Sequence, residues 1–155
     1  MNLEKYQQYS RIARGLEKAD LVLKDARIVN VFTEEIIRGD IAIQDGIIAG
    51  IGSFHGKEER DLAGRYVCPG FIDSHLHLES TLVTPAELVT AASRHGTTTF
   101  IVDPHESANV SGLAGIDYIL DQTEDVKANV YVMMPSCVPA TAIDDNGCTL
   151  TAEDM

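Results

Sequence analysis

Two histidines lie one residue apart in the segment CPGFIDSHLHLEST, residues 68–81, with acidic residues on either side. In an extended strand, successive side chains alternate between the two faces, so His75 and His77 are expected to share one face with Asp73 and Glu79. Two imidazoles on one face can bind a single divalent metal ion, and a neighbouring carboxylate can orient a ring or add an oxygen ligand. A hydrogen-bonded histidine pair without a metal gives the same short pattern, so the rest of the chain has to decide.

Further polar residues follow two later segments that are predicted to be strands. We expect strands over 71–77, 97–103 and 129–134, alternating with helices that begin near Pro85 and Ser111. Strands that alternate with helices at intervals of about 30 residues indicate βα units and a parallel sheet, in a barrel or a doubly wound fold. In both folds the chemistry lies at the carboxyl ends of the strands. No glycine-rich phosphate loop follows any of these strands, which disfavours a nucleotide-binding unit.

The second and third predicted strands end in residues that could serve the same site. Asp103, His105 and Glu106 come at or just beyond the end of the second strand, and Ser136 follows the third. Pro104 cannot continue a strand, so the pattern does not fix which of its neighbours points inward. Glu106 is the first candidate for a contact to metal or substrate, and His105 is the second. The alternative is a hydrogen-bonded turn formed by Asp103 and His105 without a ligand.

The first part of the chain has a different pattern. Residues 2–18 predict a helix with Leu3, Tyr6, Ile12 and Leu16 along one stripe. Short Val- and Ile-rich runs between residues 20 and 52 predict a small antiparallel β unit, with a tight hairpin at Asp45-Gly46. Residues 53–65 are expected to be a polar connection in which His55 is exposed. We therefore expect two domains, 1–68 and 69–155.

Composition excludes several classes of partner. The 155 residues contain 12 Lys and Arg against 24 Asp and Glu, a formal net charge of −12, and no basic run offsets it. Nucleic acid and anionic membranes are therefore not expected partners. The three cysteines, Cys68, Cys137 and Cys148, form no C-x-x-C motif, and the first residues are polar where a secretory signal would be apolar. A reducing, cytoplasmic location fits these features best.

Several longer segments resemble a known family. The segment VCPGFIDSHLHLEST is similar to the first barrel strand of the amidohydrolase superfamily, and HGTTTFIVDPHESANVSG with MMPSCVPAT narrows the resemblance to the adenine deaminase family. The preceding run from Leu21 to Gly52 is similar to the N-terminal β subdomain of that family. The resemblance implies an α/β fold: the first three βα units of a metal-dependent hydrolase (β/α)8 TIM barrel, preceded by a small β-sandwich-like subdomain.

The resemblance also implies a reaction, which is the hydrolytic deamination of adenine to hypoxanthine and ammonia. The expected cofactor is a divalent metal, Mn²⁺ or Fe²⁺, with Zn²⁺ as an alternative, because a bound metal lowers the pKa of water enough to supply hydroxide near neutral pH. His75 and His77 match the metal ligands of the first strand. The remaining candidates are residues that support the ligands from behind, Asp73 and Asp103, catalytic groups, Glu106 and His105, and substrate contacts, Glu79 and Ser136.

The chain is expected to be an N-terminal portion of such an enzyme. A closed (β/α)8 barrel typically needs about 250 residues, and the residues after Cys68 suffice for three strands. The complete polypeptide is expected to be a homo-oligomer, and the 155-residue chain alone to be inactive. Two alternatives stay open: another cyclic-amide amidohydrolase, similar to dihydroorotase or hydantoinase, or a catalytically inactive fragment that acts as an interaction module. Ammonia release from adenine, compared with hydrolysis of cyclic amides, would separate the enzymes.

Overall fold

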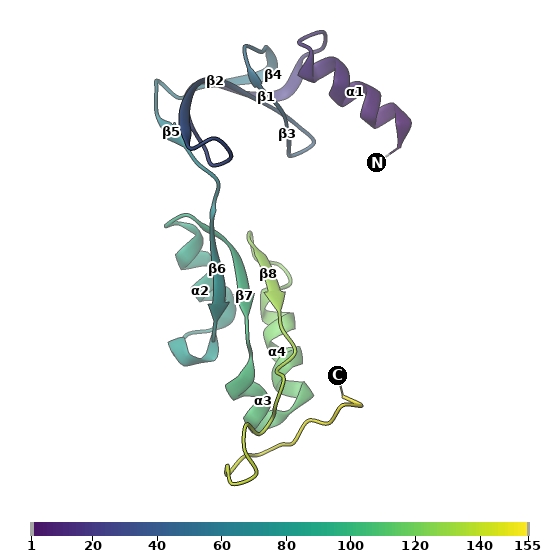
Figure 1. Ribbon diagram of the computed structural model, residues 1–155, viewed down its shortest axis with the longest axis vertical. Helices are drawn as coiled ribbons and strands as arrows, with labels where there is room; N and C mark the ends of the chain where they lie inside the picture. The colour runs from purple at the N-terminus through teal and green to yellow at the C-terminus, as the bar shows by residue number, and fades with distance from the viewer. Residues whose placement is uncertain (1, 155) are drawn as a thin grey trace. The chain divides into compact units, whose positions relative to one another are not determined.

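The computed structural model describes residues 2–154, which divide into two compact units with the boundary between Pro69 and Gly70 (Figure 1). Unit 1 is a helix followed by five strands. Its elements are α1 (Leu3–Ala13), β1 (Ala19–Asn30), β2 (Glu35–Gln44), β3 (Ile47–Gly52), β4 (Gly56–Asp61) and β5 (Tyr66–Val67).

The strands of unit 1 form one five-stranded sheet in the order β3-β2-β1-β4, with β5 also paired to β1. Strands β1, β2 and β3 are antiparallel, as the sequence predicts. The hairpin at Asp45-Gly46 is confirmed: both residues have positive φ, 50° and 75°, and Gln44 pairs with Ile47 across the turn. The prediction was wrong for residues 53–65, because they contain β4, which runs parallel to β1. Charged side chains concealed this strand, since an edge strand can expose them to solvent while its backbone pairs.

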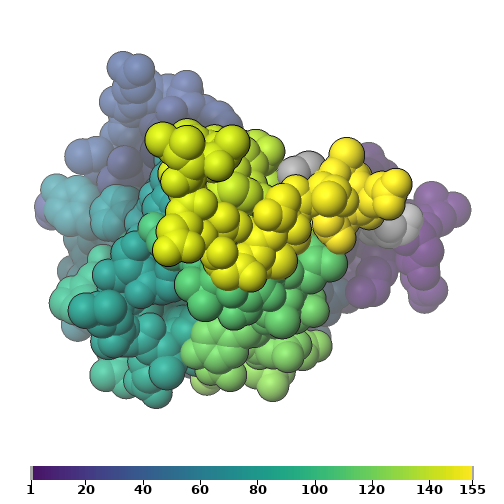
Figure 2. Space-filling view, turned by 90° about the horizontal axis from the view of Figure 1, so that it is seen from below, coloured from purple at the N-terminus to yellow at the C-terminus, as the bar shows by residue number. Residues whose placement is uncertain are grey.

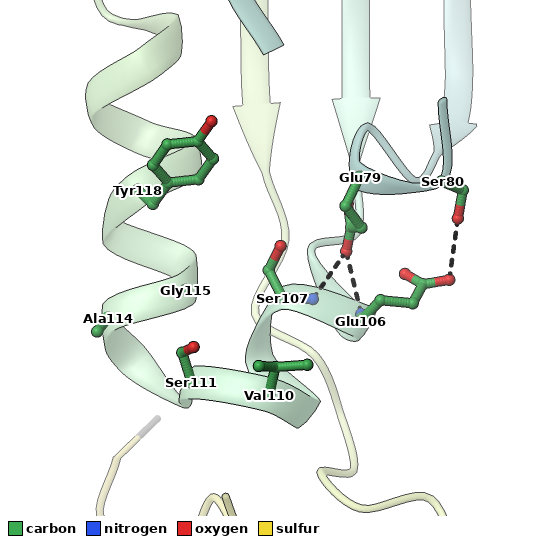
Figure 3. Close-up of a pocket in the computed structure, with 9 residues that line it drawn as sticks. All are labelled: Glu79, Ser80, Glu106, Ser107, Val110, Ser111, Ala114, Gly115 and Tyr118. Atoms are coloured by element: carbon green, nitrogen blue, oxygen red, sulfur yellow. Dashed lines mark hydrogen bonds between the residues drawn. The ribbon is translucent and has the colours of Figure 1, made fainter. Parts of the chain in front are cut away.

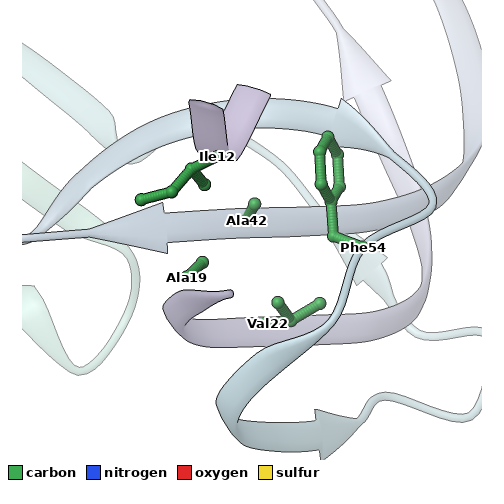
Figure 4. Packing of buried hydrophobic residues seen from close by; sticks show 5 residues of the cluster. All are labelled: Ile12, Ala19, Val22, Ala42 and Phe54. Atoms are coloured by element: carbon green, nitrogen blue, oxygen red, sulfur yellow. The ribbon is translucent and has the colours of Figure 1, made fainter. Parts of the chain in front are cut away.

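Helix α1 is shorter than predicted, and it contacts the sheet through Ile12 and through Tyr9, whose hydroxyl donates to the carbonyl of Gln44 in β2 at 3.3 Å. It stops at Ala13, and Gly15 follows with a φ of +70°. Ile12 is its one buried residue, whereas Leu3, Tyr6 and Leu16 are exposed, so the predicted apolar stripe was wrong. Ile12 packs into a small core beneath the helix, which Figure 4 shows; its members are Ile12, Ala19, Val22, Ala42 and Phe54.

A partly buried ion pair ties three segments of unit 1 together. The carboxylate of Asp40 in β2 accepts a hydrogen bond from Lys24 Nζ in β1. The same carboxylate accepts the backbone N–H groups of Asp25 and Phe54, each at 3.1 Å. Burial acts to raise the pKa of Asp40, but these three donors outweigh it and hold the pKa below its ordinary value.

The opposite face of the same sheet is also apolar. Ile41 and Ala42 are successive residues of β2, so they point to opposite faces. Ile41 belongs to a second cluster with Ala26 and Ile28. Ile48 and Ile51 pair with β2 on this face, and they are 62% and 47% exposed. Residues of this face border a hollow of about 240 Å³.

Unit 2 alternates strands with helices. Its elements are β6 (Phe71–Leu76), the 3₁₀ turn η1 (Glu79–Thr81), α2 (Pro85–Ser93), β7 (Thr97–Val102), α3 (His105–Ser111), α4 (Leu113–Thr123) and β8 (Asn129–Val132). The sheet has the order β6-β7-β8, and both pairs are parallel. The α/β class and the parallel sheet predicted from the sequence are therefore confirmed.

The core of unit 2 lies between this sheet and its helices. Val89 of α2 and Ile119 of α4 pack with Phe100 and Val102 of β7 and with Leu78. Pro85 and Val89 are the buried residues of α2. A second helix before α4 was not predicted. Gly112, with a φ of +62°, separates the two helices α3 and α4.

The segment after β8 has no regular helix or strand up to residue 154, and it packs on α3 and α4. The N–H groups of Gly147 and Cys148 donate to the carbonyl of Asn109 at 2.8 and 3.1 Å. Val138 and Leu150 pack against Ala108 of α3 and Ile116 of α4. Figure 2 shows this segment in yellow, lying across the green helices. Within residues 2–154, no helix combines the length and apolar character needed to cross a membrane.

Candidate metal centre

His75 and His77 meet at the end of β6. Their Nε2 atoms lie 3.1 Å apart, with the rings at 72° to one another. Two nitrogens bound to one tetrahedral metal ion at ordinary bond lengths are about 3.3 Å apart. The separation equally allows a hydrogen bond when one nitrogen carries a proton. Both rings thus direct the same nitrogen to a common point, which is the geometry that a shared ion requires.

Asp103 lies beside this histidine pair. It directly follows β7, and its N–H donates to the carbonyl of Leu76 at 2.9 Å. With His75 and His77 it forms a group whose ligand atoms all lie within 4.8 Å of one another. Its Oδ1 atom is buried and has no hydrogen-bond partner among residues 2–154. A buried carboxylate oxygen without a donor is costly, and a cation at this point would remove the cost. The side chains present therefore fit a divalent metal ion.

Glu106 contacts the outer nitrogen of His77. Its Oε2 atom lies 2.9 Å from His77 Nδ1, and its Oε1 atom accepts from Ser80 Oγ at 3.2 Å. A carboxylate on one ring nitrogen keeps the proton there and leaves the other nitrogen free to bind a metal. Glu106 lies in the first turn of α3, and His77 directly follows the end of β6. This contact therefore joins two neighbouring βα segments.

Alternation along the strand predicted that Glu79 shares the face of His75 and His77, and this prediction was wrong. The backbone turns into the helical region at Leu78, and Glu79 begins the turn η1. Its Oε1 atom accepts the N–H groups of Glu106 and Ser107, at 3.0 and 3.1 Å (Figure 3). Its Oε2 atom is buried without a partner in the described chain. Glu79, Glu106 and His77 form a second group of ligand atoms within 4.8 Å.

The two carboxyl groups of this pair have opposite tendencies. Burial raises the pKa of Glu79, and the neighbouring Glu106 carboxylate raises it further. For Glu106 burial also acts upward, but hydrogen bonds and the nearby His77 ring hold its pKa below the ordinary value. Glu106 therefore loses its proton more readily than Glu79, and it is the member that faces the histidine.

A pocket of about 480 Å³ opens beside this pair, between η1, α3 and α4 (Figure 3). The wall of the pocket combines polar and apolar groups. The carboxyl groups of Glu79 and Glu106 lie at one end, and Tyr118 contributes its ring from α4. The lining residues are Glu79, Ser80, Glu106, Ser107, Val110, Ser111, Ala114, Gly115 and Tyr118.

The remaining sequence candidates lie apart from the two groups of ligand atoms. Asp73 Oδ1 accepts the N–H of His75 at 3.3 Å, so it holds the backbone of the ligand strand. His105 begins α3 and lies near Asp144 of the C-terminal segment, whose pKa is lowered by Thr141 and also by this ring. Ser136 is exposed beyond β8, where its hydroxyl contacts Cys137 Sγ at 3.7 Å.

Comparison with known proteins gives a family for this geometry. The model of the Amidohydrolase family matches residues 66–154, which include all of these candidates. The chain belongs to the amidohydrolase family. A solved structure with a similar fold is the N-acyl-D-glutamate deacylase of Bordetella bronchiseptica, crystallised with zinc and a phosphonate inhibitor. It has a TM-score of 0.61 and 23% identity, and the match covers 89% of this chain and 34% of that one, so it supports the fold alone.

Two curated relatives of this amidohydrolase chain are both named adenine deaminase. The chain is 56% identical over 155 residues to the adenine deaminase of Desulfitobacterium hafniense (strain Y51), and the match covers 100% of this chain and 27% of that protein. It is 53% identical over 143 residues to the adenine deaminase of Clostridium acetobutylicum, covering 92% of this chain and 25% of that protein. The chain thus spans about a quarter of the length of the relatives it matches.

Sequence reasoning about this amidohydrolase missed Ser80, whose hydroxyl contacts Glu106, and it missed the contacts of Glu79 to the first turn of α3. A signal for the contacts of Glu79 was available in the segment after Pro104, because proline is common just before or at the start of a helix. A helix predicted there would have put the N–H groups of Glu106 and Ser107 at its first turn, where they need an acceptor. An acid near the end of the preceding strand is such an acceptor.

Proposed function

We propose that the complete polypeptide hydrolyses adenine to hypoxanthine and ammonia. The observation that carries this proposal is the 56% identity to a protein named adenine deaminase along all 155 residues of this chain. The paired histidines and the buried oxygen of Asp103 are consistent with such a reaction, because it requires an activated water molecule.

The metal in this proposal is held by His75 and His77 through their converging Nε2 atoms. Asp103 contributes its unpartnered Oδ1 to the same group. Bound there, a divalent ion supplies a water of lowered pKa, which is the nucleophile that hydrolytic deamination needs. We expect Mn²⁺ or Fe²⁺ as the ion, with Zn²⁺ as the alternative.

The chain's own residues prepare this centre. Glu106 keeps the proton of His77 on Nδ1 and so presents Nε2 to the metal. Asp73 holds the backbone N–H of His75 and limits the position of that ring. His105 stays a candidate catalytic group and Ser136 a candidate substrate contact in the complete site.

We also propose a finer architecture for the complete polypeptide. Unit 2 provides the first three βα units of a (β/α)8 barrel, in line with its parallel order β6-β7-β8. Unit 1 provides one layer of a β-sandwich-like subdomain, in line with the exposed Ile48 and Ile51 on one face of its sheet. We further propose a cytoplasmic location, on the charge and cysteine content given above, and a homo-oligomeric state, on the resemblance to the adenine deaminase family.

The test is a direct assay of the complete polypeptide. Loaded with Mn²⁺, it should convert adenine to hypoxanthine, followed by absorbance, with one ammonia released per turnover. His75→Ala combined with His77→Ala should lower kcat/KM at least about a thousandfold, because members of one site act as a unit. Metal content should fall in the same variant.

Two comparisons make this assay decisive. Dihydroorotate and hydantoin should not be hydrolysed, and faster turnover of either would replace adenine as the proposed substrate. His55→Ala is the matched control, since His55 is exposed in unit 1 and contacts Glu59. The 155-residue chain alone should be inactive. Normal metal content in the variant with both His75→Ala and His77→Ala would refute the assignment of these histidines as metal ligands.

A further inference from the structure

We infer that Glu79 and Ser80 are positioning residues, which hold Glu106 against the Nδ1 atom of His77 and thereby fix the ring of a metal ligand. The inference rests on the proposed function, because it concerns how the same centre retains its metal. It assigns Glu79 a role other than the substrate contact expected from the sequence.

The carboxylate of Glu106 needs outside support to stay in place. Its side chain is 52% exposed, so packing alone does not restrict its rotatable bonds. Its Oε2 atom lies 2.9 Å from His77 Nδ1, and Ser80 Oγ donates to its Oε1 atom at 3.2 Å. The hydroxyl therefore fixes the half of the carboxylate that does not contact the histidine.

Glu79 fixes the backbone from which that side chain extends. Its Oε1 atom accepts from the N–H groups of Glu106 and Ser107 at 3.0 and 3.1 Å. These groups belong to the first turn of α3, where backbone N–H groups have no acceptor within the helix. One oxygen of η1 thus determines where α3 starts relative to the end of β6, which is also where His77 lies.

A second metal ion between Glu79, Glu106 and His77 is the competing interpretation, because their ligand atoms lie within 4.8 Å of one another. The contacts favour positioning. Both oxygens of Glu106 and one oxygen of Glu79 already face N–H or O–H groups. Nδ1 of His77 faces Glu106 as well. Glu79 Oε2 is the one acceptor atom of this group that lacks a partner within residues 2–154.

Positioning predicts a specific combination of effects. Changes to residues that orient a metal ligand typically lower metal affinity about 10- to 100-fold. In the complete polypeptide, Glu79→Ala should weaken Mn²⁺ binding by that factor without changing the number of ions bound at saturation. Glu79→Gln keeps a carbonyl acceptor for the two N–H groups and should stay within about threefold of the wild type. Ser80→Ala should weaken binding by a smaller factor, because it removes one hydroxyl.

The experiment measures Mn²⁺ affinity by competition with a chelator and metal content at saturation. The KM for adenine is measured at saturating Mn²⁺ and should be unchanged in all three variants. Ser10→Ala and Glu87→Ala are the matched controls, since both side chains are exposed and lie on α1 and α2, outside the candidate centre. Both should retain wild-type affinity.

Three results would overturn the inference. Loss of one bound ion at saturation in Glu79→Ala would make Glu79 a ligand. A raised KM with unchanged Mn²⁺ affinity would make it a substrate contact. Unchanged affinity in both Glu79→Ala and Ser80→Ala would remove any role at the metal. If Glu79→Ala does not fold, Ser80→Ala decides by the same criteria, because it removes one exposed hydroxyl.

Failure of the proposed function gives a different pattern. In that case the wild type would bind Mn²⁺ through His75 and His77 but would not deaminate adenine. The affinity measurements on Glu79 and Ser80 would still support or reject positioning, because they need no substrate.

Discussion

At the residue scale, the candidate centre contains a conflict that a metal ion would resolve. Asp103 has a buried oxygen without a donor in the described part of the chain, next to two imidazole nitrogens at 3.1 Å from one another. A structure selected for stability alone would pair or replace such a carboxylate. Unsatisfied groups of this kind concentrate where a ligand completes the site.

Asp103→Asn should therefore have opposite effects on stability and on metal binding. Without metal, the change removes the charge of a partly buried carboxylate whose Oδ1 atom has no donor within residues 2–154, and the free energy of unfolding of the complete polypeptide should rise by about 1 kcal/mol. With metal, the Kd for Mn²⁺ should increase at least about tenfold. Urea unfolding of the metal-free protein and chelator competition measure the two quantities. The control is Asp117→Asn on the exposed side of α4, and a less stable Asp103→Asn with normal Mn²⁺ affinity would contradict the assignment.

The histidine pair shows how far a local pattern reaches. Alternation along a strand correctly brought His75 and His77 together, because His75 lies in β6 and His77 directly follows the end of that strand at Leu76. The same rule failed for Glu79, because the chain leaves the strand at Leu78. Strand periodicity carries no information about where the strand ends. The contacts of Glu79 and Ser80 depend on α3, so they required the tertiary structure.

At the scale of elements, β1 and β2 are joined by the partly buried pair Lys24 and Asp40. Asp40 is 8% exposed and receives hydrogen bonds from Lys24 and from two backbone N–H groups. These donors outweigh burial and lower its pKa from the ordinary value of 3.8. A carboxyl whose pKa is lower in the folded state stabilises the fold above its unfolded pKa, and this contribution disappears as the pH falls.

Asp40→Asn should consequently destabilise unit 1 by about 2–3 kcal/mol at pH 7, since hydrogen bonds to charged groups are lost. The difference from the wild type should shrink as the pH drops below the ordinary value of 3.8, where Asp40 itself becomes protonated. Pulse proteolysis in urea, with mass spectrometry of peptides from residues 19–61, measures it in the complete polypeptide. Exposed Glu35→Gln in β2 is the control, and a pH-independent difference would show that charge is not the cause.

The elements that sequence reasoning missed share a physical cause. β4 is an edge strand with five exposed residues, so its backbone pairing with β1 leaves no apolar alternation to detect. Helix α3 has seven residues, and Gly112 separates it from α4. Short elements are stabilised by partners elsewhere in the chain, which a window of sequence does not contain. The longer alternation of strands and helices was predictable because burial on a parallel sheet imposes it.

At the scale of the whole molecule, the formal charge of −12 favours retention of a cation. The candidate ligands all belong to unit 2, and unit 1 has its own core around Val22. Metal binding should therefore stabilise one unit more than the other. A ligand present at about 100 times its Kd stabilises the state that binds it by about 2.7 kcal/mol.

Removal of the metal by a chelator should change hydrogen exchange unevenly. In the complete polypeptide, peptides covering residues 71–81 and 97–107 should lose protection, because they carry the candidate ligands and the residues that support them. Peptides from β1 and β2 should keep their exchange rates within about twofold. Restored protection after addition of Mn²⁺ is the internal control, and equal loss in both units would show that the metal acts globally instead.

The contact between His77 and Glu106 spans 29 positions of the chain. During synthesis on the ribosome, the histidine pair emerges first, followed by α2 and β7, and only then by the glutamate that fixes one of its rings. An ion that arrives in this interval meets two imidazoles on a single strand and nothing that determines which nitrogen faces it. Completion of α3 is thus the event after which Glu106 can fix the ring of His77, so the order of translation separates folding of the strand from completion of the candidate centre.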